Sequence, residues 1–94
     1  MPNSSRWPVR GDLAHIRMAG KVFVPHYVVP VPHLVNGAGA QVRKAGKPDA
    51  EVLADLPTGA LFNVLDLAGA WAWGQVGEDG VVGYVTADSI HPAP

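Results

Sequence analysis

The segment from Gly69 to Val85 reads GAWAWGQVGEDGVVGYV, and it decides the fold. Its Asp79-Gly80 pair, set between two apolar runs, is typical of a tight β-hairpin turn. On the first strand of this hairpin, one alanine separates Trp71 from Trp73. Because side chains alternate between the two faces of a strand, both indoles are expected on the same face. The question is whether that face is packed inside the protein or is built to hold a ligand.

Further short strands are expected around the hairpin, because apolar runs follow one another at close spacing with turn residues such as Pro57 and Gly59 between them. The candidate strands are residues 40–43, 52–56, 60–67, 71–76 and 81–85, and residues 86–90 predict one 3₁₀ turn. Five or six short strands of this kind predict an all-β protein, folded as a small and strongly bent barrel. Its expected core residues are Phe62, Val64, Trp73, Val76 and Val85. Alternation on the 60–67 strand predicts Phe62 and Val64 on one face and Leu61, Leu65 and Leu67 on the other.

Residues 1–36 are expected to form an N-terminal extension that packs on a barrel made of residues 37–94. A short helix is predicted in it, capped by Asp12 and ended by Gly20. Residues 21–35, rich in proline, predict an edge strand or a strap across the barrel, because proline cannot donate to a central ladder. The strap should be covered because it is apolar, at Val22, Val24, Val28, Val29 and Leu34. The tail HPAP is not expected to continue as a normal strand, so the N-terminal extension is the expected donor of the closing strand.

The composition excludes several classes of function. The chain has 94 residues, no cysteine and a formal charge of −1, so a disulfide framework, a cysteine nucleophile and a nucleic-acid footprint are not expected. The four histidines have no metal-binding spacing, and we expect neither a metal nor a cofactor: His15, His26, His33 and His91. With no signal-peptide core and no apolar run long enough to cross a membrane, a cytoplasmic location is favoured.

The ordered landmarks of the second part resemble the bacterial SH3 domain, SH3b, over about fifty residues. The landmarks are Val42-Arg43, Val52, Leu56, Gly59, Trp73 and Val76 in the pattern WxxV, Gly83-Tyr84-Val85, and Ile90. The expected barrel is therefore SH3-like. One departure is Pro48, which comes later after Val42-Arg43 than is usual, so the first long loop is expected to have its own shape.

The two parts together are similar to the front half of proteobacterial NlpC/P60 cysteine peptidases, in which a catalytic domain that cuts peptidoglycan stem peptides follows. The resemblance implies a non-catalytic module that helps to bind or select stem peptides, with either a stem peptide or an NlpC/P60 catalytic domain as its partner. In such peptidases the SH3b domain helps to form the pocket for the peptide's free amino end. Four residues are carried over as a candidate ligand site: Trp71, Tyr84, Asp49 and Glu51.

Each candidate also has a structural interpretation. Trp73 is expected to be mainly structural, whereas Trp71 is as consistent with a ligand contact as with packing. Tyr84 suits a core position with its hydroxyl at the rim, and Asp49 and Glu51 are also typical of solvated loop carboxylates. The alternative function is a protein-interaction or structural module, in which the same aromatic face docks another domain or subunit.

Overall fold

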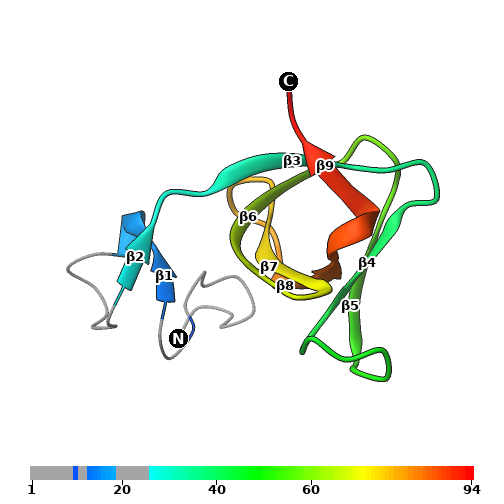
Figure 1. Ribbon diagram of the computed structural model, residues 1–94, viewed down its shortest axis with the longest axis horizontal. Coiled ribbons are helices and arrows are strands. Elements are labelled where there is room, and N and C mark those ends of the chain that lie inside the picture. Colours follow the sequence, from blue (N-terminus) through cyan, green and yellow to red (C-terminus); the bar gives the residue numbers. More distant parts are fainter. Residues whose placement is uncertain (1–9, 11–12, 19–25) are drawn as a thin grey trace.

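Short β-strands make up more than half of the residues that the structure describes, and Figure 1 shows them in this computed structural model. The structure describes residues 10, 13–18 and 26–94. The strands are β1 (Leu13–His15), β2 (His26–Val28), β3 (Val31–Val35), β4 (Ala40–Arg43), β5 (Val52–Leu56), β6 (Leu61–Ala68), β7 (Trp71–Val76), β8 (Val82–Thr86) and β9 (Ile90–Pro92). Two 3₁₀ turns accompany them, at Ile16–Met18 and Ala87–Ser89. The predicted all-β class and the turn after the hairpin are confirmed.

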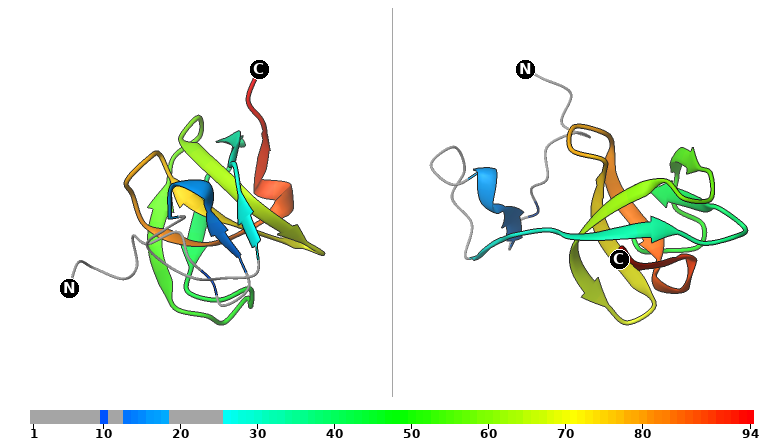
Figure 2. Two further views of the ribbon diagram at one scale, coloured as in Figure 1. Left: turned by 90° about the vertical axis from the view of Figure 1, so that its left-hand side faces the viewer. Right: turned by 90° about the horizontal axis from the view of Figure 1, so that it is seen from above.

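Seven of the strands form one antiparallel sheet, which bends into an SH3-like barrel (Figure 1). The strand order is β5-β4-β8-β7-β6-β3-β9, and β5 and β9 at its two ends are not paired with each other, so the sheet is not closed. The sheet has more strands than predicted because β3 and β9 add to the five strands from β4 to β8 that the sequence indicated. Strands β1 and β2 form a separate parallel pair beside the barrel (Figure 2).

The hairpin of β7 and β8 has the predicted turn. The N–H of Val76 donates to the carbonyl of Val81 at 3.0 Å, and the N–H of Gly80 donates back to the carbonyl of Val76 at 2.9 Å. Gly77 opens the turn with a φ of 57°, in the left-handed region that glycine adopts without a steric penalty. The four residues GEDG therefore form the loop, and the strands on either side are held in a single register.

Strand β6 contains a bulge that the strict alternation of the sequence did not predict. Its pairing with β7 passes from Val64 opposite Gly74 to Asp66 opposite Trp73, which leaves Leu65 as an extra residue. After the bulge the faces are exchanged, so Leu67 pairs with Ala72 and does not share the face of Leu65. The predicted common face of Leu61, Leu65 and Leu67 is wrong at Leu67 for this reason.

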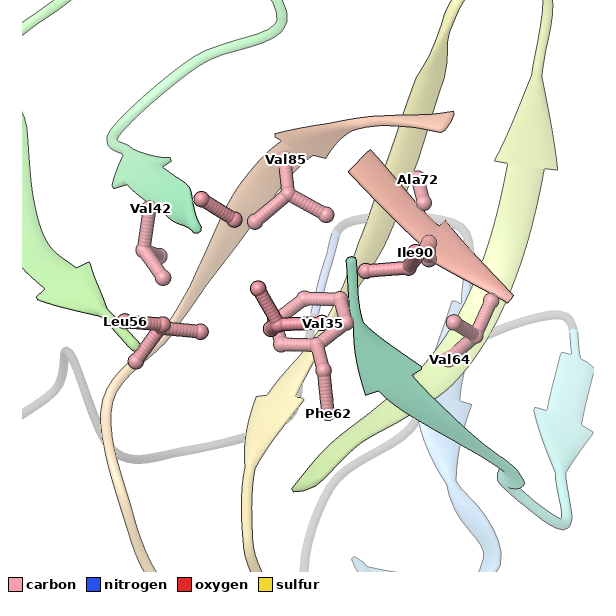
Figure 3. Packing of buried hydrophobic residues seen from close by; sticks show 9 residues of the cluster. Val35, Val42, Leu56, Phe62, Val64, Ala72, Val85 and Ile90 are labelled. Atoms are coloured by element: carbon pink, nitrogen blue, oxygen red, sulfur yellow. The ribbon is translucent and has the colours of Figure 1, made fainter. Parts of the chain in front are cut away.

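The barrel interior holds one cluster of buried apolar side chains, shown in Figure 3. Phe62 lies at its centre with no exposed surface, and Val85 is equally buried. The other members come from strands β3 to β9: Val35, Ala40, Val42, Leu56, Val64, Ala72 and Ile90. Val76 packs against the cluster while partly buried. Four of the five predicted core residues therefore lie in or against this cluster, and Trp73 is buried in a different one.

Strand β3 of the N-terminal extension is an inner strand of the sheet. It pairs with β6 on one side and with β9 on the other. Two predictions are wrong here. The tail does form a strand, β9 at Ile90–Pro92. Strand β3 is not an edge strand, because it has a paired strand on each side. The reason is that β9 pairs only with residues 33–35, so Pro30 and Pro32 stand outside that ladder.

The rest of the extension differs from the prediction in two respects. The expected helix is reduced to the 3₁₀ turn Ile16–Met18, because residues 13–15 pair in parallel with residues 26–28 as β1 and β2. Val29 is 68% exposed instead of covered, whereas Val28 packs on the barrel. The predicted cap Asp12, the stop Gly20, and the apolar residues Val22 and Val24 lie outside the described residues. The division of the chain at residue 36 stays a prediction.

Candidate functional site

Trp71 and Trp73 lie on the same face of β7, as the sequence predicts, and that face is the outer side of the barrel. Trp71 is paired with Thr86 and Trp73 with Tyr84 on β8, while Ala72 between them belongs to the interior cluster. Neither indole is therefore inside the barrel. Because the two side chains share one face, how far each indole is buried depends on which other residues cover it.

Trp73 is covered by the N-terminal extension. Its side chain is 4% exposed and packs with Leu65 and Val82 in a second cluster, against which Val28 of β2 also packs. The guanidinium carbon of Arg10 lies 4.8 Å from the centroid of the Trp73 ring. A guanidinium over an indole face is attracted by the negative charge of the ring face. Trp73 is therefore a packing residue, and it holds the extension on the barrel.

Asp66 fixes the position of Arg10. Its Oδ2 accepts a hydrogen bond from Arg10 Nη2 at 2.8 Å, in an ion pair whose side chains are 25% and 33% exposed. Asp66 stands on the Trp73 face because the β6 bulge shifts the alternation by one residue at Leu65. A change of one residue in strand register thus brings a carboxylate next to the cation that covers Trp73.

Trp71 and Tyr84 meet the first long loop, residues 44–51, at Gly46. A Cβ atom on Gly46 would lie 3.3 Å from Cγ of Trp71 and 3.5 Å from Cδ2 of Tyr84, so the loop backbone lies against both rings. Both rings are half-buried. The structure therefore brings together the two aromatic members of the predicted site, under the loop that also carries the two acidic members.

Asp49 and Glu51 are both exposed on this loop. The loop is closed at its base by the N–H of Lys44, which donates to the carbonyl of Glu51 at 2.9 Å. Neither carboxylate is among the residues that line the groove beside Trp71. Whether these residues bind a ligand stays a prediction.

An open groove of about 460 Å³ runs beside Trp71. Strands β4 and β5 contribute to its lining, together with Trp71 of β7, Thr86 at the end of β8 and Ser89 in the following turn. The polar lining residues are Gln41, Arg43, Asp55, Thr86 and Ser89. Ligand sites of proteins commonly have volumes of about 300–1,000 Å³ with a few converging polar groups. The groove is thus large enough for a small ligand or a stretch of peptide.

Three of the polar lining residues are joined by a chain of side-chain hydrogen bonds. Arg43 Nη2 donates to Gln41 Oε1 at 2.8 Å, and Gln41 Nε2 donates to Asp55 Oδ1 at 3.1 Å. Arg43 Nη1 also donates to the carbonyl of Ala50 at 2.8 Å, which ties the long loop to β4. None of these three side chains was predicted as a site residue, and Arg43 was expected only as part of the Val42-Arg43 landmark. The available signal was that Gln41 and Arg43 flank the apolar Val42 and so share the opposite face of the same strand.

The described part of the chain holds neither a metal cluster nor a membrane-spanning helix. No three metal-binding side chains come together among residues 10, 13–18 and 26–94. His33 is buried, and its Nδ1 lies 2.9 Å from the carbonyl oxygen of Val31. Over the same residues, no helix is long and apolar enough to span a membrane.

The matched part of the sequence coincides with the barrel. A family model described as the bacterial dipeptidyl-peptidase SH3 domain matches residues 42–90, more than half of the chain. The chain belongs to this family. Searches of the curated proteins and of the solved structures found no match.

Membership of the bacterial dipeptidyl-peptidase SH3 family confirms the resemblance to a bacterial SH3 domain. The matched range begins at Val42 and ends at Ile90, the first and last landmarks of that resemblance. Both ends lie in the interior cluster, since Val42 has no exposed surface and Ile90 is 7% exposed. The domains of this family are generally non-catalytic binding modules, and the further similarity to NlpC/P60 peptidases stays a prediction.

Proposed function

We propose that this domain binds the free amino end of a peptidoglycan stem peptide and so selects substrate for a cell-wall peptidase of the NlpC/P60 type. The observation that carries the proposal is the position of Trp71, which lies on the outer face of the barrel and lines an open groove. An indole that faces a groove offers a large apolar surface to a ligand at little cost in conformational entropy. The family's description, a domain of dipeptidyl-peptidases, supports a peptide as the ligand.

The proposed roles follow from the chemistry of the site. Asp49 and Glu51 neutralise the ammonium group of the peptide, and the Tyr84 hydroxyl orients it by a hydrogen bond. Trp71 supports the alanyl methyl group and the first peptide bond. Since the two carboxylates are exposed on a loop, each ion pair contributes only about 0–1 kcal/mol, and weak binding is expected from the domain alone.

A titration of the isotope-labelled chain with a stem peptide that has a free L-alanyl terminus tests this proposal. We expect amide shifts at Trp71, Tyr84 and residues 44–51, and those at Tyr84 and residues 44–51 should disappear when the peptide's amine is acetylated. The double variant D49N/E51Q should weaken binding, while D79N removes one charge from the exposed hairpin turn and should leave it unchanged. Absence of shifts at millimolar peptide would refute recognition by the domain alone.

The alternative is that the domain docks an adjoining NlpC/P60 catalytic domain. A second groove favours it, because its lining is mostly apolar and Val29, Val31 and Leu67 are 68%, 54% and 60% exposed there. Exposed apolar surface of this kind is typical of interaction sites. Adding an NlpC/P60 catalytic domain to the labelled chain should then shift Val31 and Leu67, and L67E should abolish the shifts. Shifts confined to the Trp71 groove would contradict this alternative.

A further inference from the structure

Arg43 is held in place by neutral groups alone. Its guanidinium donates to the carbonyl of Ala50 and to the side-chain oxygen of Gln41, each at 2.8 Å. Among the residues that the structure describes, no carboxylate lies within ion-pair distance of it, whereas Arg10 is paired with Asp66. The side chain is half-buried at the groove wall. A guanidinium has five N–H donors, so two neutral acceptors leave three donors and a full positive charge for a further partner.

The hydrogen-bond chain keeps this charge apart from the nearest carboxylate of the groove. The Gln41 amide stands between Arg43 and Asp55, since it accepts from one and donates to the other. The same bonds hold the guanidinium in one position, so little side-chain freedom is lost when it binds a ligand. The groove thus has a cationic group and an anionic group at separate points, and an indole also lines it.

We propose that Arg43 binds a carboxylate group of a short peptide that lies in this groove, with an apolar part of the peptide against Trp71. The planar fork of a guanidinium matches the two oxygens of a carboxylate, which accept parallel hydrogen bonds. A single negative charge suits the groove better than a phosphate dianion, because Asp55 lines the same groove and repels the second charge. The Thr86 and Ser89 hydroxyl groups add polar atoms near the peptide backbone.

This carboxylate site goes beyond the amino-end recognition proposed above and does not depend on it. Amino-end recognition uses the acidic loop residues Asp49 and Glu51, whereas the carboxylate site uses Arg43 on β4. Two dipeptides distinguish binding at the carboxylate site from amino-end recognition. N-acetyl-L-alanyl-L-alanine has a carboxylate and no amine, and L-alanyl-L-alanine amide has an amine and no carboxylate.

The test is a titration of the labelled full chain with each dipeptide, followed through the Nε–H of Arg43 and the indole N–H of Trp71. We expect N-acetyl-L-alanyl-L-alanine to shift both signals, and its methyl ester to shift neither. R43Q should weaken binding of the acetylated dipeptide by about tenfold or more, since a charge-assisted hydrogen-bond pair is lost. R43K, which keeps the charge but loses the fork, should fall between. K47Q removes an exposed cation that does not line the groove, and it should change binding by less than about twofold.

A variant that binds more tightly provides a control for misfolding, because a misfolded chain would lose affinity and not gain it. D55N removes the competing negative charge and should tighten binding of the acetylated dipeptide about two- to fivefold. Equal binding of the acid and its methyl ester, or unchanged binding in R43Q, would overturn the carboxylate site. Equally tight binding of inorganic phosphate would overturn the assignment to a carboxylate. If only the dipeptide amide fails to bind, amino-end recognition fails and the Arg43 site stands.

Discussion

At the scale of single residues, Trp71 and Trp73 differ in environment although they share one face of one strand. Trp73 is 4% exposed beneath Arg10 and Val28, and Trp71 is half-buried beneath Gly46 at the edge of a groove. The amount of surface that each indole has removed from water determines what its loss would cost. The two substitutions to alanine should therefore separate a packing role from a binding role.

We predict that W73A lowers the free energy of unfolding by about 3–5 kcal/mol, as for other large buried aromatic residues. W71A should lower it by only about 1 kcal/mol, because its ring is half-exposed, and should abolish ligand-induced shifts in the groove. Urea unfolding followed by circular dichroism measures both. An equal loss of stability in the two variants would show that Trp71 is also a packing residue.

Gly74 is the second residue on which the barrel depends. A Cβ atom there would lie 2.2 Å from the carbonyl oxygen of Asn63 and 2.8 Å from Cε2 of Phe62. The first neighbour is backbone of the paired strand and the second is the ring at the centre of the interior cluster, so neither can move without disturbing the sheet. Glycine is required here for close approach of β6 to β7.

G74A is therefore predicted to lower the free energy of unfolding by about 1–3 kcal/mol through overpacking. Gly37 provides the matched control, because a Cβ atom there meets nothing within 4 Å and its φ is not positive. G37A should change stability by no more than about 0.5 kcal/mol. Thermal unfolding of both variants checks the pair, and equal midpoints would contradict the close packing at Gly74.

At the scale of elements, the N-terminal extension contributes to the barrel in two separable ways. Strand β3 lies between β6 and β9 and supplies Val35, which is 1% exposed. Arg10 adds an ion pair and a cation–π contact on the outer face. Strand β3 contributes to the core and Arg10 only to the surface, so the loss of β3 should lower the free energy of unfolding more than the loss of Arg10.

Two truncations test this difference. A chain that starts at Leu13 lacks Arg10, and its free energy of unfolding should be lower by about 1–2 kcal/mol. A chain that starts at Asn36 loses β3 with its two ladders and should not fold cooperatively. Both are measured by thermal unfolding. Limited proteolysis that removes the residues before Asn36 and leaves the thermal midpoint unchanged would contradict the role of the extension.

At the scale of the whole molecule, the domain offers grooves on its surface but has no cysteine that could act as a nucleophile. The chain has no cysteine, so a thiolate mechanism cannot run on its own residues. We predict that the isolated chain does not hydrolyse stem peptides, and chromatography of a peptide digest checks this. An NlpC/P60 peptidase under the same conditions serves as the positive control, and cleavage by the isolated chain would overturn the non-catalytic role.

The sequence alone predicted much of the barrel. The strands at residues 40–43, 52–56 and 71–76 are found with the predicted bounds, and the GEDG loop lies where the Asp79-Gly80 pair indicated. The shared face of the two tryptophans was also predictable. These features depend on alternation and on turn chemistry, which are local in the chain, so the sequence is sufficient to recognise them.

Only the tertiary structure decided which tryptophan is covered and where a ligand has room. Arg10 reaches Trp73 from a distant part of the chain, and it does so because an unpredicted bulge places Asp66 on the same face. The Arg43 groove likewise combines side chains of β4 and β5 with an indole from β7. Alternation specifies the face of a strand to which a side chain belongs. What covers that face, and hence whether it is core or site, depends on contacts between segments that are far apart in the sequence.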